Sequence, residues 1–228
     1  MQTLFNWFGN RAACEITPQE IERRLDELAR RGRQPATLNR YRSLLSLIYR
    51  LAIRDGKIQD NPVHQVRRRR ENNARVRFLD PGEEAALRSK IRLLAPEREA
   101  ELDLALHSGM RRNEQYHLRW EQVNLDVGII SILDSKNSER RHVPANSEVR
   151  RALEYLLGKR DDSGYVVPGG RAGARERDWQ RWFEEAVKQA GLKDFRWHDL
   201  RHTFASRLAM AGVPLRTIGN CSATKRRQ

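Results

Sequence analysis

The sequence predicts a mainly α-helical protein with a small β-sheet, organised as two domains of unequal size. Three observations predict this class. Capped segments with apolar residues at helical spacing fill the first half, a run of arginines at 67–70 interrupts them, and beyond Val123 the period shortens to that of strands. The predicted parts are a helical domain at 1–66, a basic linker at 67–78 and a larger domain at 79–228.

The first helix signal is a cap. Thr17 stands at the N-cap position, Pro18 occupies the first helical position and Glu20 completes a capping box. The apolar residues that follow at helical spacing are Ile21, Leu25 and Leu28. We therefore expect an amphipathic helix that ends near Gly32.

A second helix is expected from Thr37 to Gly56. Its predicted apolar face consists of Leu38, Tyr41, Leu45, Ile48, Leu51 and Ala52. Arginines lie between these positions, and Arg40 is a candidate for contact with a polyanion. For any single arginine here, an ordinary solvated helix face is an equally good interpretation.

The linker holds four consecutive arginines, which are Arg67, Arg68, Arg69 and Arg70. Such a segment suits a tether that lies along a phosphate backbone, and a merely solvated tether is the alternative. The whole chain favours the first interpretation, because 44 Lys and Arg against 30 Asp and Glu leave a net charge of +14. Ribosomal proteins, membrane-surface proteins and basic toxins share this balance, so charge nominates nucleic acid without proving it.

The larger domain opens with the same cap logic, from Asp80 to Glu83. A helical pattern then continues to Gly109. Two short strands are predicted at 129–133 and 141–143, on either side of a polar turn at 134–139. Helices are expected to resume at 148–157, 177–190 and 199–211.

Two cysteines, Cys14 and Cys221, stand in unrelated contexts. They predict neither a disulfide framework nor a metal site, and they suit a reducing bacterial cytoplasm, close to the nucleoid for a protein that binds nucleic acid. No apolar stretch approaches the roughly 18–20 residues of a membrane span, and the first residues lack the features of a signal peptide.

Breaking and rejoining a phosphodiester without a metal requires a particular set of side chains. Guanidinium groups suit the negative charge at phosphorus, because each donates paired hydrogen bonds and keeps its proton. An acid must protonate the leaving 5′-oxygen, and a nucleophile must attack in line.

Two segments of the sequence carry that set. Gly109-Met110-Arg111-Arg112-Asn113-Glu114, followed by Leu118 and Trp120, resembles the first arginine box of the tyrosine recombinases, or phage-type integrases. His198-Asp199-Leu200-Arg201-His202-Thr203 resembles the second. Each box alone is a weak or moderate signal, and an isolated Arg-x-x-Glu is usually a helical ion pair. Both boxes in this order make coincidence a poor explanation.

The resemblance implies roles for four residues of this chain. Arg111 and Arg201 would clamp the scissile phosphate, His198 would act as general acid or base, and Lys136 would protonate the leaving oxygen. Glu114, about one helical turn after Arg111, would support that arginine. No metal or nucleotide cofactor is implied, because arginines take over the electrostatic role of a metal.

The resemblance extends to the first domain, which looks like a core-binding domain whose first helix is shortened or absent. The implied partner is double-stranded DNA, and the implied assembly is a homo-oligomer, a tetramer in the family. The predicted DNA-binding residues are Arg40, Arg67, Arg68, Arg69 and Arg70.

The tail departs from the family pattern after Ile218, and no tyrosine follows Tyr165 in the sequence. The sequence therefore predicts a truncated recombinase without its nucleophile, inactive in this form, and a frameshift near codon 219 would explain the change. One alternative is a non-catalytic protein that occupies recombination sites on DNA. Another is an unrelated basic helical protein that binds RNA or DNA.

Overall fold

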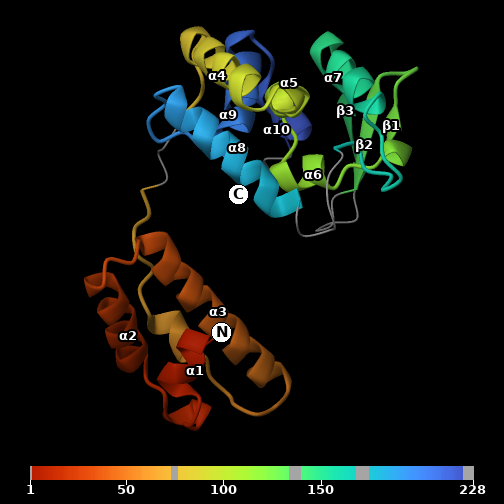
Figure 1. The fold of residues 1–228 in the computed structure, drawn as a ribbon. Helices are drawn as coiled ribbons and strands as arrows, with labels where there is room; N and C mark the ends of the chain where they lie inside the picture. The colour runs from red at the N-terminus through yellow and green to blue at the C-terminus, as the bar shows by residue number, and fades with distance from the viewer. Residues whose placement is uncertain (1, 73–76, 134–139, 168–174, 223–228) are drawn as a thin grey trace. The chain divides into compact units, whose positions relative to one another are not determined.

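The structure is a computed structural model that describes residues 2–72, 77–133, 140–167 and 175–222. The chain divides into two compact units, Met1–Arg75 and Val76–Gln228 (Figure 1). The division falls within the stretch that was predicted to be a linker.

The first unit is helical. Its elements are α1 (Gln2–Phe8), the 3-10 turn η1 (Ala13–Glu15), α2 (Pro18–Arg30), α3 (Pro35–Arg54) and the 3-10 turn η2 (Pro62–Gln65). The predicted capping box of α2 is confirmed: the Glu20 N–H donates to Thr17 Oγ1 at 3.2 Å, and the Thr17 N–H donates to the Glu20 carboxylate at 3.3 Å. Satisfying these otherwise unbonded N–H groups fixes where the helix begins.

The apolar face of α3 differs from the predicted one. Leu38 and Leu45 are buried as expected, but Ile48 and Leu51 are 42% and 41% exposed. Tyr49 takes the buried place instead, because its hydroxyl finds a partner there, the Ala13 carbonyl at 2.9 Å. The predicted face therefore holds over the first half of the helix and differs near its end, where Tyr49 replaces Ile48 and Leu51, and the helix begins at Pro35 rather than Thr37.

The chain beyond η2 returns to the helices of the first unit. The Arg69 N–H donates to Asn39 Oδ1 at 2.9 Å, and Asn39 Nδ2 donates to the Arg69 carbonyl at 2.8 Å. The Arg69 guanidinium lies 2.6 Å from Asp26 of α2. Arg69 is thus tied to α2 and α3, whereas the other predicted DNA contacts are exposed, namely Arg40, Arg67, Arg68 and Arg70. Their role in binding DNA stays a prediction.

The second unit combines helices with one small sheet. Its helices are α4 (Pro81–Leu94), α5 (Glu99–Ser108), α6 (Arg112–Tyr116), α7 (Ser147–Leu157), α8 (Arg175–Gln189), α9 (Trp197–Met210) and α10 (Leu215–Ser222), with 3-10 turns η3 (Pro96–Arg98) and η4 (Trp120–Gln122). The strands β1 (Val123–Asn124), β2 (Ile129–Leu133) and β3 (Arg140–Pro144) form an antiparallel sheet in the order β1-β2-β3. The sequence predicted β2 and β3 but missed β1, which is too short to show a period.

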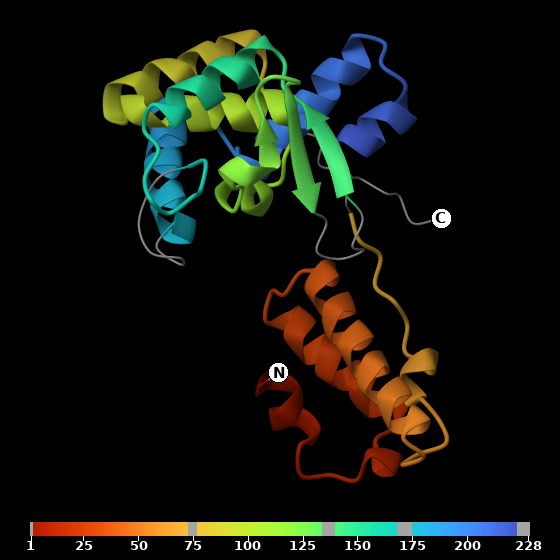
Figure 2. The same ribbon diagram turned by 90° about the vertical axis from the view of Figure 1, so that its right-hand side faces the viewer.

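Helix α5 stands between two apolar cores, and this explains why both of its sides are apolar. Leu102 and Leu106 pack into one core with α4, α8 and α9, while Leu104 packs into the other with α7 and the sheet. Figure 2 shows α10 beside β3, and α10 also contacts α9. Helix α9 therefore packs against both α5 and α10 within the second unit. In the part of the chain that the structure describes, no helix is both long and apolar enough to span a membrane.

Two truncations on α3 test its observed orientation. Leu45→Ala empties a site that is 4% exposed and should lower the free energy of unfolding by about 2–5 kcal/mol. Ile48→Ala, at a position that is 42% exposed, should cost at most about 1 kcal/mol. Denaturant unfolding of the whole chain measures both. Equal losses would contradict the orientation of α3 described here.

Candidate functional site

The first arginine box lies where α5 gives way to α6. Arg111 is the extended residue before α6, and its N–H donates to Glu114 Oε2 at 2.7 Å. Its guanidinium Nη1 also donates to Glu114 Oε1 at 2.7 Å. The predicted pairing of these two residues is confirmed. Because both ends of Arg111 are held by one carboxylate, its side chain is oriented although 42% of it is exposed.

A third arginine joins this pair from the sheet. Arg141 of β3 donates to Glu114 Oε2, and its side chain is only 12% exposed. Arg141 was expected in a strand, but no part in the site was predicted for it. Alternation along the strand could have revealed it, because Arg141 shares a face with Val143, which is 1% exposed.

The second arginine box meets the first through a backbone carbonyl. Arg201 of α9 is 6% exposed, and its Nη1 donates to the carbonyl oxygen of Gly109. Gly109 has a φ of +63°, and a Cβ on it would lie 2.4 Å from Cδ1 of Phe204 in α9. A side chain at position 109 would therefore be strained and would also push α9 away. Glycine permits the close approach that brings Arg201 to Arg111.

The charge at Arg201 is costly in the absence of an anion. Burial lowers the pKa of its guanidinium to about 10, with a further lowering by the positive charges of Arg111 and Arg141 against the raising effect of Glu114. The group still carries its charge at neutral pH. An oxyanion bound to these arginines would offset both the burial and the mutual repulsion.

Two histidines stand on the same helix as Arg201. The rings of His198 and His202 lie 4.8 Å apart and nearly perpendicular. Partial burial of the His198 ring lowers its pKa, and the positive charges of His202 and Arg201 lower that pKa further. A neutral imidazole beside an oxyanion site can accept a proton and return it. The arrangement suits binding of a phosphate group together with proton transfer.

The start of α9 is anchored to the start of the second unit. The Asp199 carboxylate accepts from the Arg196 N–H at 2.8 Å, which caps α9. Thr203 Oγ1 donates to the Asp199 carbonyl at 2.8 Å and accepts from the Leu79 N–H at 2.9 Å. The two bonds of Thr203 are buried, so they hold His198 and Arg201 on a rigid support.

Lys136, predicted as the acid, lies outside the described residues. The tyrosines all lie within them, and the following contacts hold them. Tyr41 donates to Thr3, Tyr49 to Ala13 and Tyr116 to Glu101, Arg119 donates to Tyr165, and Tyr155 lies exposed on α7. Burial and the neighbouring Glu101 carboxylate raise the pKa of Tyr116 well above its ordinary value, so that phenol stays protonated.

Among the described residues, no cluster of His, Cys, Asp and Glu could hold a metal ion.

Both units of this chain are similar to known proteins. Residues 77–223 match the family model described as the phage integrase family, and residues 1–69 match that of the phage integrase central domain. The integrase of Salmonella phage P22 is 30% identical over 218 residues, covering 85% of this chain and 55% of the relative. Tyrosine recombinase XerC of Xanthomonas campestris pv. campestris strain B100 is 29% identical over 219 residues, covering 92% of this chain and 67% of XerC.

A solved structure shares the fold. A lambda integrase dimer bound to a COC′ core site is similar with a TM-score of 0.76 at 20% identity, covering 99% of this chain and 85% of that one. The chain described here spans about half the length of phage P22 integrase (55%).

Gly109 can be tested against a second glycine with positive φ. Gly109→Ala should cost about 1–2 kcal/mol for the left-handed backbone, and the clash with Phe204 should add about 1–3 kcal/mol. At Gly212 the φ is +79° and a Cβ would meet no atom within 4 Å. Gly212→Ala should therefore show only the backbone cost of about 1–2 kcal/mol. Thermal unfolding measures both, and equal losses would contradict the close packing at Gly109.

The lowered pKa of His198 predicts a pH dependence of stability. The unfolded chain takes up a proton near the ordinary value of 6.5, before the folded chain does. Stability that is fully present above that pH is therefore lost as the pH falls through the folded pKa. In His198→Gln this loss should be smaller. Unfolding free energies measured across this pH range give the answer, and parallel curves for the two proteins would contradict it.

Proposed function

This chain belongs to the phage integrase family, and from that premise we propose that it is a site-specific DNA recombinase. In this proposal it binds duplex DNA, and the second unit holds the phosphate at which strands are cut and rejoined. The observation that carries the proposal is the junction at Gly109, where Arg201 bonds to the carbonyl that lies two residues before Arg111. The Arg201 guanidinium thus reaches the backbone of the first arginine box, and the charge of Arg111 is close enough to lower the pKa of Arg201, as in a phosphate clamp built from two arginines.

The roles follow from the chemistry of the transition state. Arg111 and Arg201 hold the non-bridging oxygens of the phosphate, and Glu114 orients Arg111. His198 moves a proton at the phosphate, and Lys136 protonates the leaving 5′-oxygen. The attack on phosphorus that releases this oxygen needs a nucleophile, and none of the five tyrosines is assigned to that role, so the form described here is expected to bind the phosphate without cutting the strand. The arginines supply the electrostatic stabilisation, so the proposal needs no metal ion or nucleotide cofactor. Several copies assemble on the DNA in this proposal.

The first unit contributes affinity for the DNA backbone. The predicted contacts that are exposed on it are Arg40, Arg67, Arg68 and Arg70. Each phosphate that they neutralise releases condensed counterions, so binding should weaken steeply with added salt. The lambda integrase of similar fold was solved on a core site, which supports duplex DNA as the ligand.

A second candidate function is binding of recombination sites without cleavage. The positions of the tyrosines favour it, because the Tyr116 and Tyr49 hydroxyls are used in buried contacts with Glu101 and Ala13. A nicked duplex that loses a short fragment on cleavage separates the two functions. A covalent protein–DNA band on a denaturing gel supports recombination, and stable binding without that band supports occupancy.

Neutral variants of the two clamp arginines test the proposal. Arg111→Gln and Arg201→Gln should each weaken duplex binding about tenfold or more, because each removes a charged hydrogen bond to phosphate. Arg151→Gln is the matched control, since Arg151 on α7 is 69% exposed and pairs with Glu148. It should change affinity by less than about twofold. Titrations at fixed salt measure all three.

The same titrations address the unrelated-protein alternative. If Arg111→Gln and Arg201→Gln weaken binding no more than Arg151→Gln or neutral variants of Arg67 and Arg68, the clamp does not exist. In that case the chain is a basic nucleic-acid-binding protein without a phosphate site of this kind.

A further inference from the structure

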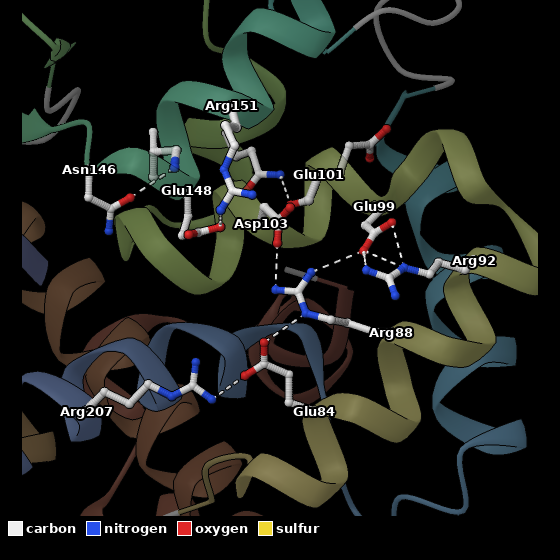
Figure 3. Close-up of polar contacts among 12 residues, drawn as sticks. Glu84, Arg88, Arg92, Glu99, Glu101, Asp103, Asn146, Glu148, Arg151 and Arg207 are labelled. Atoms are coloured by element: carbon white, nitrogen blue, oxygen red, sulfur yellow. Dashed lines mark hydrogen bonds and ion pairs between the residues drawn. The ribbon is translucent and has the colours of Figure 1, made fainter.

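A group of charged side chains joins α4, α5 and α9. Figure 3 shows Glu84 of α4 between Arg88 of the same helix and Arg207 of α9. Arg88 Nε donates to Glu84 Oε1 at 2.9 Å, and the Arg207 guanidinium donates to Glu84 Oε2. Arg88 Nη2 in turn lies 2.6 Å from Asp103 Oδ1 of α5. A continuous chain of ionic contacts therefore runs from α9 through α4 to α5.

Arg92 and Glu99 extend this group toward solvent. Arg92 Nη2 lies 2.6 Å from Glu99 Oε1, and Arg88 Nη1 lies 3.4 Å from the same oxygen. The Arg92 side chain is 63% exposed, whereas those of Glu84 and Arg88 are 16% and 19% exposed. The buried part of the group is thus the part that connects α9 to its neighbours.

The buried carboxylate is held in its ionised form. Burial raises the pKa of Glu84, but the hydrogen bonds from Arg207 and Arg88 outweigh burial and leave that pKa below its usual range. Burial likewise acts to lower the pKa of Arg88, and Asp103 and Glu84 reverse that effect. Removing one member would leave the others charged, half-buried and without that partner, which destabilises their present placement.

The position of Arg207 along α9 gives this contact its importance. Arg207 follows Arg201 by six residues, or about 9 Å of helix. Arg201 joins α9 to the end of α5 at Gly109, and Arg207 joins α9 to the middle of α5 through Glu84, Arg88 and Asp103. Thr203 and Arg201 tie α9 to its surroundings over its first two turns, and Arg207 adds a tie nearer the end of the helix, where neither of them reaches.

We propose that Glu84 is a positioning residue for the phosphate site, because its bonds to Arg207 and Arg88 set the placement of α9 and therefore of Arg201 and His198. The proposal rests on the function proposed above and deepens it. Glu84 carries a negative charge and cannot itself bind a phosphate. Its effect on DNA can only be indirect or repulsive, and these two effects have opposite signs.

The test compares Glu84→Gln with Glu99→Gln in the whole chain. Both variants remove one carboxylate from the same group, and only Glu84 reaches α9. On charge alone, each loss would leave duplex binding unchanged or tighter. Positioning predicts instead that Glu84→Gln weakens binding roughly three- to tenfold, while Glu99→Gln stays within about twofold of the parent. Equal effects of the two variants overturn the proposal.

A double variant separates positioning from any other effect. In an Arg201→Gln background, Glu84→Gln should change duplex affinity little further, because the group that it positions is already gone. A second full loss in that background overturns the proposal. Arg207→Gln cuts the same tie from the side of α9. Because it removes a positive charge and so weakens DNA binding on charge alone, it replaces Glu84→Gln only in the His198 titration described next, if Glu84→Gln does not fold.

The imidazole of His198 gives a readout that does not depend on DNA. In an NMR titration, loosening of α9 should move its midpoint from the lowered value toward 6.5 in Glu84→Gln and leave it unmoved in Glu99→Gln. An unmoved His198 midpoint in folded Glu84→Gln overturns the positioning role. If Arg201→Gln leaves duplex affinity unchanged, the proposed function fails instead, and the His198 titration alone decides the role of Glu84.

Discussion

The bond between the buried Arg201 guanidinium and the Gly109 carbonyl is the constraint on which the second unit depends. A buried arginine is stable only when its donors are satisfied and the surrounding helices leave it room. Here the carbonyl at the end of α5 is the acceptor, and glycine at that position lets Phe204 of α9 come close. The same contact brings Arg201 to the residue that begins the first arginine box.

The surroundings of this bond explain why the site should prefer an anion. Arg111 and Arg141 share the carboxylate of Glu114, and their charges add to the burial that lowers the pKa of Arg201 to about 10. The fold thus holds like charges together before any ligand arrives. That preorganisation is useful to an oxyanion, because the protein has already met the cost of placing the charges. Helix α9 is held by the bond between Thr203 and Leu79 and by the bond between Arg207 and Glu84. Both bonds oppose a movement of α9 that would separate these like charges.

Much of the fold was readable from local signals, and the rest was not, for physical reasons. Caps such as Thr17 with Glu20 and Asp80 with Glu83 are short-range chemistry, so the sequence predicted both helix starts. Near the end of α3 both Ile48 and Tyr49 stand at helical spacing from Leu45, and the bond of the Tyr49 hydroxyl to Ala13, 36 residues away, is a long-range contact that favours Tyr49. Arg111, His198 and Arg201 could be nominated by family resemblance. Strand alternation could have marked Arg141 as facing inward, but its bond to Glu114 and the bond of Glu84 to Arg207 join distant segments and could not be predicted.

The most direct measurement is a crystal structure of this chain with duplex DNA. The account predicts a backbone phosphate within hydrogen-bonding distance of both the Arg111 and the Arg201 guanidinium groups, with the His198 ring beside it. Such a phosphate would be held by residues that come from α9 and from the start of α6. DNA bound through the exposed arginines of the first unit alone, with neither clamp arginine touching a phosphate, would contradict the account.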